Sequence, residues 1–307
     1  MEQIAIVGTG ALACLFAARL AAINVKVTLL GSWREGISAV NQQGVSLENS
    51  EGTKVFPVRA TCSPEDFQNL KYTLVLVKSW QTERAAAQIA QFLRPDGLAV
   101  TLQNGLGNLE ILQRELGWKR VTQGVTTAGA TLLGPAHVRQ VGPPRINLGK
   151  HPRVQALDRI LRAAGFLVHV EDQLESLIWK KLMINSAINP LTAVLQVPNG
   201  RLLELPGARK IMSAAAQEIA GLAKLKGIPV QDIDPWEAVE GVARSTAQNL
   251  SSMLQDIRRG APTEIEAING AVVREASQVG MNVPINYTLL QLVRALVAAK
   301  ESNYEFS

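Results

Sequence analysis

A glycine-rich turn near the N-terminus, set between an apolar segment and a helix of small residues, constrains the fold most strongly. Its residues are Gly8-Thr9-Gly10-Ala11-Leu12-Ala13, which fit the pattern G-x-G-x-x-G/A. The first glycine of that pattern permits a tight turn, the second lets the backbone approach a pyrophosphate, and a small third residue lets the helix pack closely on the sheet. Helix N-terminal amides then meet the phosphate charge. The context predicts a dinucleotide-binding turn, with an ordinary strand-to-helix turn as the alternative.

Apolar, β-prone segments alternate with helix-length or loop-length sequence along the first half of the chain. They lie at residues 3–7, 25–30, 72–77, 98–102 and 120–127, and a helix is expected over residues 11–22. This alternation predicts an α/β domain of the Rossmann type, a parallel sheet with helices on both faces. Turn signals at Gly134-Pro135 and Gly142-Pro143-Pro144 predict an antiparallel extension over residues 130–148.

Long helical patterns replace the strand signal after about Asp172. One pattern, ending before Gly280, places at helical spacing Ile265, Ile268, Val272, Ala276 and Val279. Breaks between the helices are expected at Pro190, Pro198, Pro206, Pro229 and Pro235. The sequence therefore predicts a dinucleotide-binding domain over residues 1–171 and an all-helical domain over residues 172–307.

Composition excludes several classes of function. The chain has 307 residues, 47% of them hydrophobic, which is enough to bury the cores of two domains. Its net charge is +5, but Lys and Arg are scattered and aromatic residues are only 5%, so no nucleic-acid partner is expected. Two cysteines and three histidines show no metal-ligand spacing, so no metal is expected. The apolar opening is preceded by Glu2 and interrupted by Arg19, and we expect a cytoplasmic protein without a membrane span.

The cofactor preference should be determined just after the second strand, where an NAD-binding protein usually carries an acid. The sequence there is Leu30-Gly31-Ser32-Trp33-Arg34, without a carboxylate. Ser32 and Arg34 can bind a 2′-phosphate, which favours NADP, and hence NADPH, as the cofactor. Arg34 as a solvated loop residue is the alternative, and Trp33 either covers the adenine or packs within the loop.

A polar stripe crosses an apolar helical segment in the second half. Lys181, Asn185 and Asn189 are four residues apart, so they follow one helix face with a drift of about 40° per step. Such groups among Leu182, Ile184 and Ile188 suit a site for a polar substrate. A partly solvated face, with Asn189 as a cap near Pro190, is the alternative.

A second polar cluster runs from Asn249 to Asp256 and is followed by Thr263 and Glu264. Asn249 and Ser252 are spaced for one helix face. A joint site with Glu264 is therefore plausible, although Glu264 near a helix start also fits a charge favoured by the helix dipole.

Taken together, these segments resemble the ketopantoate reductase family over nearly the whole chain. The resemblance rests on the opening glycine turn, Val77-Lys78-Ser79-Trp80-Gln81-Thr82, Leu102-Gln103-Asn104-Gly105-Leu106-Gly107, Trp179-Lys180-Lys181-Leu182 with Asn185 and Asn189-Pro190, and Ser251 to Asp256 with Thr263-Glu264-Ile265. It implies a Rossmann domain followed by a helical domain of the 6-phosphogluconate dehydrogenase type. It also implies NADPH-dependent reduction of 2-dehydropantoate to (R)-pantoate, on the pathway to pantothenate and coenzyme A. Ala13 departs from the family, which commonly has glycine there.

The resemblance implies a role for each candidate residue. Lys181 is the expected general acid and Glu264 its supporting carboxylate. The expected cofactor-binding residues are Gly8, Thr9, Gly10, Ala11, Leu12, Ala13, Ser32, Arg34, Lys78, Asn104 and Glu264. The expected substrate-binding residues are Asn104, Lys181, Asn185, Asn189, Asn249 and Ser252.

Two other functions stay open at this point. One is a reductase of the same fold acting on another small 2-oxo acid, and the other is a non-catalytic NADP-binding regulator. The presence of both Lys181 and Glu264 argues against the regulator. The oligomeric state is also open, with a homodimer among the expected forms.

Overall fold

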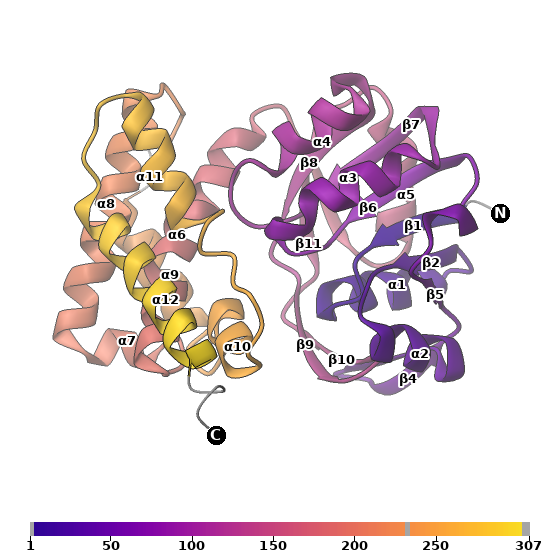
Figure 1. Ribbon diagram of the computed structural model, residues 1–307, viewed down its shortest axis with the longest axis horizontal. Helices are drawn as coiled ribbons and strands as arrows, with labels where there is room; N and C mark the ends of the chain where they lie inside the picture. Colours follow the sequence, from indigo (N-terminus) through magenta and orange to yellow (C-terminus); the bar gives the residue numbers. More distant parts are fainter. Residues whose placement is uncertain (1–2, 231–233, 303–307) are drawn as a thin grey trace. The chain divides into compact units, whose positions relative to one another are not determined.

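The computed structural model describes residues 3–230 and 234–302, and the chain divides into two compact units (Figure 1). The first unit comprises Met1–Gln103 and Asn108–Leu174, and the second comprises Asn104–Gly107 and Glu175–Ser307. The short segment Asn104–Gly107 therefore packs with the helical unit, although it lies within the first half of the sequence. The functional domains at 1–171 and 172–307 stay a prediction.

An eight-stranded sheet forms the centre of the first unit, in the order β12-β11-β8-β7-β6-β1-β2-β5. Neighbouring strands run parallel except β8 and β11, which are antiparallel. The strands are β1 (Gln3–Val7), β2 (Lys26–Leu30), β5 (Arg59–Thr61), β6 (Leu70–Val75), β7 (Leu93–Thr101), β8 (Val121–Thr126), β11 (Arg145–Gly149) and β12 (Leu167–Glu171). The predicted parallel sheet is confirmed, with shifted strand boundaries and with two strands, β5 and β12, that were not predicted.

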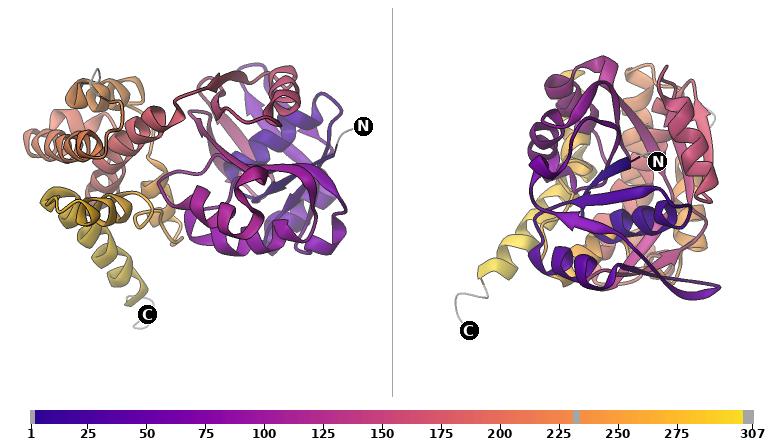
Figure 2. Two further views of the ribbon diagram at one scale, coloured as in Figure 1. Left: turned by 90° about the horizontal axis from the view of Figure 1, so that it is seen from above. Right: turned by 90° about the vertical axis from the view of Figure 1, so that its right-hand side faces the viewer.

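Helices cover both faces of this sheet, as predicted. They are α1 (Ala11–Ala21), α2 (Arg34–Gln43), α3 (Thr82–Ala90), α4 (Asn108–Leu116) and α5 (Val154–Ala163). Because side chains alternate along a strand, Ile4 and Ile6 of β1 enter the core that holds α1 and α5, whereas Ala5 and Val7 enter the core that holds α3 and α4. Figure 2 shows these two pairs of helices on opposite sides of the sheet.

A four-stranded sheet, ordered β4-β3-β10-β9, extends the first unit. Its strands are β3 (Val45–Asn49), β4 (Gly52–Phe56), β9 (Gly129–Gly134) and β10 (His137–Val141). The antiparallel extension predicted over residues 130–148 is confirmed by the β9–β10 and β8–β11 pairs. Neither β3 nor β4 was predicted from the sequence. Most residues of β4 are exposed and show no apolar alternation, whereas β3 does alternate, with Val45 and Leu47 buried, and was missed.

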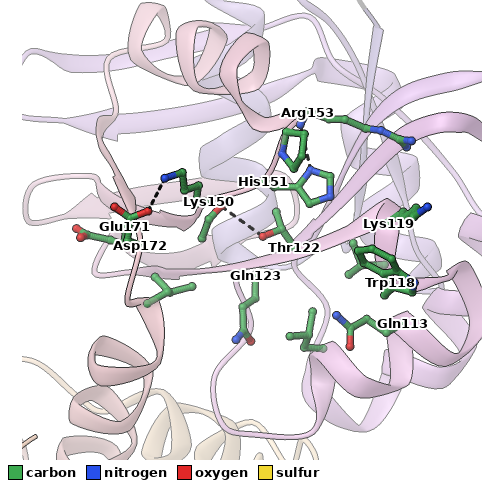
Figure 3. A pocket seen from close by; sticks show the side chains of 15 residues that line it. Gln113, Trp118, Lys119, Thr122, Gln123, Lys150, His151, Arg153, Glu171 and Asp172 are labelled. Carbon is green, nitrogen blue, oxygen red and sulfur yellow. Dashed lines mark hydrogen bonds and ion pairs between the residues drawn. The ribbon is translucent and has the colours of Figure 1, made fainter. Parts of the chain in front are cut away.

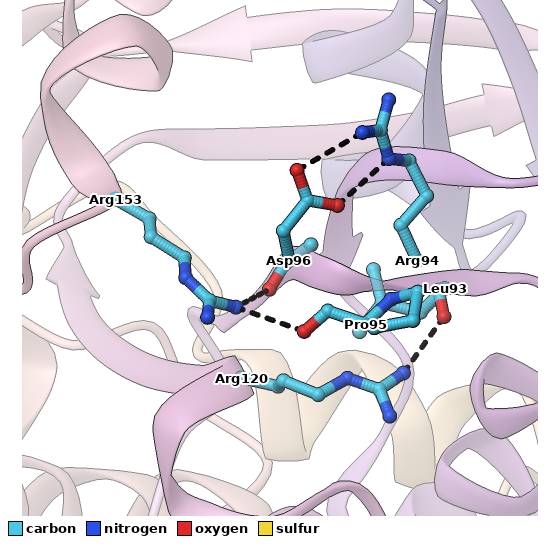
Figure 4. Close-up of polar contacts among 7 residues, drawn as sticks. Leu93, Arg94, Pro95, Asp96, Arg120 and Arg153 are labelled. Atoms are coloured by element: carbon cyan, nitrogen blue, oxygen red, sulfur yellow. Dashed lines mark hydrogen bonds and ion pairs between the residues drawn. The ribbon is translucent and has the colours of Figure 1, made fainter.

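Strand β7 begins earlier than predicted, and arginine side chains donate to carbonyl groups of its first residues (Figure 4). Arg120 Nη2 donates to the carbonyl of Leu93 at 2.8 Å. Arg153 Nη1 donates to the carbonyls of Pro95 and Gly97 at 3.2 and 3.0 Å. A proline and a glycine weaken the strand signal in the sequence, so these long-range contacts could not be predicted from the local pattern.

Every regular element described from α6 onward is a helix, so the predicted all-helical second half is confirmed over that part of the chain. The helices are α6 (Leu174–Leu195), α7 (Arg201–Glu204), α8 (Pro206–Leu225), α9 (Pro235–Ser245), α10 (Ser252–Arg258), α11 (Asn269–Gln278) and α12 (Pro284–Ser302). Their shared core includes Leu182, Met212, Ile219, Val272 and Val293.

Four of the five prolines mark helix boundaries as predicted. Pro206 and Pro235 occupy first helical positions, where no backbone N–H is needed, and Pro198 and Pro229 lie between helices. The predicted break at Pro190 is wrong, because α6 continues through it to Leu195.

The helical pattern that begins at Ile265 is only partly correct. Residues 265–268 form turns, and α11 begins at Asn269 and ends at Gln278, before Gly280. The apolar spacing reflects burial of Ile265 and Ile268 in the same core as Val272, since a turn can present side chains to a core as a helix does.

Within residues 3–230 and 234–302, no helix is both long and apolar enough to span a membrane. The same residues contain no group of three or more His, Cys, Asp or Glu side chains that could hold a metal ion.

Candidate active site

The glycine turn has the conformation that its sequence predicts. Gly8 has φ of +136°, and a Cβ atom there would lie 2.8 Å from the carbonyl oxygen of Leu76. No other residue fits that position without moving the backbone. Ala13 is fully buried in the core beneath α1, so its small side chain allows the close helix packing that the motif requires.

The N-terminus of α1 suits a phosphate group. Gly10 is the N-cap residue, and a Cβ atom there would meet no other atom within 4 Å. No side chain caps this helix and no acidic residue lies in its first turn. The exposed amides and the positive end of the helix dipole therefore face open space, which fits a dinucleotide pyrophosphate.

The loop after β2 places Ser32 and Arg34 at the surface, with Arg34 as the first residue of α2. Gly31 is closed to a larger side chain, because a Cβ atom would lie 2.6 Å from Thr9 Cγ2. This contact gives a steric reason for the missing carboxylate. The Trp33 ring lies against Gly36 in the first turn of α2, and its contact with an adenine stays a prediction.

A buried polar network follows β6 and β7 and was not predicted. Lys78 is partly buried and directly precedes the 3-10 turn Ser79–Gln81. Gln103 Nε2 donates to the carbonyl of Val77 at 3.0 Å and to Thr82 Oγ1 at 2.9 Å. Thr82 Oγ1 also lies 2.8 Å from Asn108 Oδ1. The network joins the loop that carries Lys78 to Gln103 and to the start of α4. The motif around Gln103 was its only signal in the sequence.

The polar stripe of the second unit lies on one helix, as its spacing predicts. Lys181 and Asn185 are partly buried on α6, and Asn189 is only 7% exposed. Asn189 as a helix cap is wrong, because α6 continues for six residues beyond it, to Leu195. The stripe is therefore a set of polar groups held within an apolar helix.

Burial makes Lys181 a weaker base than an ordinary lysine. Desolvation lowers the pKa of Lys181 to about 8, and the nearby Glu264 carboxylate acts in the opposite direction. Both effects are expected, because a low-dielectric site disfavours the ammonium and an anion favours it. The side chain can therefore exist as acid or as base near neutral pH.

Glu264 is 5% exposed and lies in a turn that precedes α11. Its Oε2 atom accepts a hydrogen bond from Asn104 Nδ2 at 3.1 Å, and its backbone carbonyl accepts bonds from Ala267 and Ile268. The alternative in which Glu264 only complements the dipole of the following helix is wrong, because the first turn of α11 contains no acidic residue.

The segment Asn104–Gly107 is fixed to this turn by its backbone. Leu106 N donates to the carbonyl of Ala267 at 2.9 Å. Gly105 has φ of +80°, and a Cβ atom there would overlap the same carbonyl. Gly105 is therefore required for the close approach that brings Asn104 to Glu264.

Asn249 and Ser252 do not share a helix face, so that prediction is wrong. Helix α10 begins at Ser252, and Asn249 lies before it in an irregular segment. The backbone carbonyl of Asn249 accepts a hydrogen bond from Asn199 N at 3.0 Å. Ser251 is the N-cap, since its Oγ accepts from Leu254 N at 3.1 Å. Both candidate side chains are partly buried, and their contact with substrate stays a prediction.

A separate cavity of about 590 Å³ lies in the first unit, beside the amino end of β8 (Figure 3). Trp118, Thr122 and His151 line it, and none of the predicted site residues does. Its Lys150 is paired with Asp172 at 2.8 Å. The carboxyl ends of parallel strands are the usual binding edge, and this cavity lies at the opposite end of β8.

The first unit belongs to the dinucleotide-binding class of α/β proteins, because its parallel sheet carries the glycine turn directly after β1. The chain is a member of the ketopantoate reductase family. Residues 4–153 match the family described as Ketopantoate reductase PanE/ApbA, and residues 173–297 match Ketopantoate reductase PanE/ApbA C terminal.

Individual relatives agree with this membership. A 2-dehydropantoate 2-reductase of Archaeoglobus fulgidus is 34% identical and aligns over 96% of this chain and 98% of its own. The crystal structure of a PanE/ApbA family ketopantoate reductase from Ralstonia eutropha JMP134 is 30% identical, has a TM-score of 0.92 and covers 98% of this chain and 100% of its own. A D-mandelate dehydrogenase solved with NADH and anilino(oxo)acetate has the same TM-score at 24% identity, covering 97% and 99% of the two chains, and shows the likeness of fold alone.

Proposed function

We propose that this protein reduces 2-dehydropantoate to (R)-pantoate with NADPH. The observation that carries the proposal is the pair formed in the second unit by the partly buried Lys181, with a pKa of about 8, and the buried Glu264, which favours the protonated form of the lysine. Reduction of a ketone needs a proton donor at the oxygen, and a lysine with this pKa can donate near neutral pH. Membership of the ketopantoate reductase family supports the substrate class.

The glycine turn would hold the dinucleotide. Gly8 and Gly10 leave room for the pyrophosphate at the amides of α1, with Thr9, Ala11, Leu12 and Ala13 completing the turn. Ser32 and Arg34 would bind the 2′-phosphate, and the resemblance supports cofactor contacts for Lys78 and Asn104. When bound, the nicotinamide supplies a hydride to the ketone carbon.

The side chains of the second unit would carry the remaining chemistry. The Lys181 ammonium would stabilise negative charge on the ketone oxygen and donate its proton there. Glu264 would favour the ammonium form and accept a hydrogen bond from the substrate hydroxyl. Asn185, Asn189, Asn249 and Ser252 would bind the carboxylate and hydroxyl groups, and Asn104 would help through its contact with Glu264.

The test is NADPH oxidation followed at 2-dehydropantoate concentrations around KM, beside pyruvate and 2-oxoisovalerate. We expect kcat/KM for 2-dehydropantoate to exceed the others by at least tenfold, and Lys181→Ala to lower turnover of 2-dehydropantoate by roughly two to four powers of ten. Efficient reduction of another 2-oxo acid with none of 2-dehydropantoate would overturn the proposed substrate. Binding of NADPH without turnover of any of the three acids would overturn the proposed activity. Cytoplasmic location and a homodimer stay predictions.

A further inference from the structure

A proline inside α6 removes one backbone donor from the helix that carries Lys181. In a regular helix the N–H of residue 190 would donate to the carbonyl of Ser186, four residues earlier. Pro190 has no N–H, and its ring crowds that same carbonyl. Ser186 is fully buried, so water is not available to replace the donor.

The side chain of Asn269 supplies the missing hydrogen bond. Asn269 Nδ2 donates to the Ser186 carbonyl at 3.2 Å and to Asn286 Oδ1 at 3.0 Å, and Asn269 is fully buried. Both amide protons of Asn269 therefore serve acceptors that would otherwise be unsatisfied. The contact joins positions 83 residues apart in the sequence.

The orientation of this amide is fixed from the other end of the network. Asn286 Nδ2 donates to the Ala215 carbonyl at 3.1 Å and to Glu218 Oε2 at 2.7 Å, so its oxygen must face Asn269. Glu218 in turn accepts from the backbone N–H groups of Ile285 and Asn286 at the start of α12. The network thus connects α6 to α8, α11 and α12, and the donor and acceptor of each hydrogen bond in it are fixed.

Asn269 lies five residues after Glu264 and begins α11. The intervening turn is closed by hydrogen bonds from Ala267 and Ile268 to the carbonyl of Glu264. A bond from Asn269 to the middle of α6 therefore fixes the turn that carries Glu264 against the helix that carries Lys181.

We propose that Asn269 is a positioning residue for the reaction: its bond to the Ser186 carbonyl, left without a helical donor by Pro190, sets Glu264 relative to Lys181. This inference rests on the proposed roles of Lys181 and Glu264. It makes Asn269 and Pro190 a coupled pair, because a residue with a backbone N–H at position 190 would satisfy Ser186 without Asn269.

The test is a double-mutant cycle of Asn269→Leu and Pro190→Ala, with Asn282→Leu as the same substitution at an exposed position. Leucine matches asparagine in size and has no donors. We expect Asn269→Leu to lower kcat at least tenfold and to leave the Kd for NADPH unchanged. In its pH profile, the high-pH limb of kcat/KM should appear at a lower pH. Pro190→Ala alone should keep kcat within twofold, and added to Asn269→Leu it should restore kcat at least threefold and return the limb toward its original position.

Several outcomes would overturn the inference. Loss of thermal stability in Asn269→Leu with unchanged kcat and pH profile would show a merely structural role. Failure of Pro190→Ala to restore kcat would separate Asn269 from the proline. If Asn269→Leu does not fold, Asn269→Ser takes its place, because serine keeps a polar group for Asn286. The single variant Asn269→Ser is then compared with the double variant Asn269→Ser/Pro190→Ala in the same assays. Full turnover by Lys181→Ala would instead overturn the proposed role of Lys181, and absence of turnover in the unaltered protein would overturn the proposed function, whatever the Asn269 variants do.

Discussion

The Nδ2 atom of Asn104 lies 3.1 Å from Oε2 of Glu264, although 160 positions separate the two residues in the sequence. Asn104 follows β7, whereas Glu264 precedes α11, and both belong to the second unit. The same carboxylate raises the pKa of Lys181 against the effect of burial. One buried acid therefore connects an amide of the β7–α4 loop with the lysine of α6.

Removing the charge of Glu264 should make Lys181 a weaker base still. In Glu264→Gln the group keeps its shape but no longer stabilises the ammonium, so the pKa of Lys181 should fall below its value of about 8. The pH profile of kcat/KM should show its high-pH limb at a lower pH, and the rate at pH 8 should drop. An unchanged limb would mean that Glu264 does not act on the titrating group.

Reduction by the unaltered protein should lose rate above about pH 8. Lys181 donates a proton only as the ammonium, and the fraction in that form falls about tenfold per unit once the pH exceeds its pKa of about 8. The reverse reaction needs the neutral amine and should gain rate over the same range. Initial rates in both directions between pH 6 and 9.5 test this. If the rates of both directions rise, or both fall, over this pH range, Lys181 is not the group that titrates.

Lys181→Ala should lower kcat by roughly two to four powers of ten, the usual contribution of a placed general acid. Lys180→Ala is the matched control, because neighbouring helix residues point about 100° apart. NADPH affinity should stay near the original value in both variants, as measured by fluorescence titration. Equal losses of kcat at both lysines would show that the assignment of Lys181 is wrong.

The sequence predicts those parts of the site that a single local element determines. Gly8 and Gly10 lie within one strand-turn-helix unit, and the spacing of Lys181, Asn185 and Asn189 follows from helix geometry alone. Local rules are sufficient there because neighbours in sequence are also neighbours in space.

Local rules fail where distant residues decide the outcome. Pro190 predicts a helix end, but α6 continues through it, and Asn269 donates to the Ser186 carbonyl from another helix. The contact between Asn104 and Glu264 likewise depends on tertiary packing, which no spacing rule contains. Both contacts join residues that are far apart in the sequence, so they follow from the folded structure and not from the local pattern.

The preference for NADPH should depend on Arg34. Arg34→Ala removes a charge-assisted contact to the 2′-phosphate and should weaken NADPH binding by about 1.5–3 kcal/mol, with NADH almost unchanged. Glu35→Ala, at the next exposed position of α2, is the control and should not weaken either cofactor. Both dissociation constants come from fluorescence titration. Equal weakening of NADPH and NADH in Arg34→Ala would assign Arg34 a role other than the phosphate contact.

Ser252 and Asn249 should bind the substrate rather than the cofactor. Both are partly buried beside the capped start of α10, where Ser251 is already engaged with Leu254 and Thr192. Ser252→Ala and Asn249→Ala should each raise KM for 2-dehydropantoate by an amount equivalent to about 1–3 kcal/mol, because each variant loses a hydrogen bond to the substrate. The Kd for NADPH should barely change. Ser245→Ala, at an exposed hydroxyl near the end of α9, is the control. Unchanged KM in both site variants would reject this placement of the substrate.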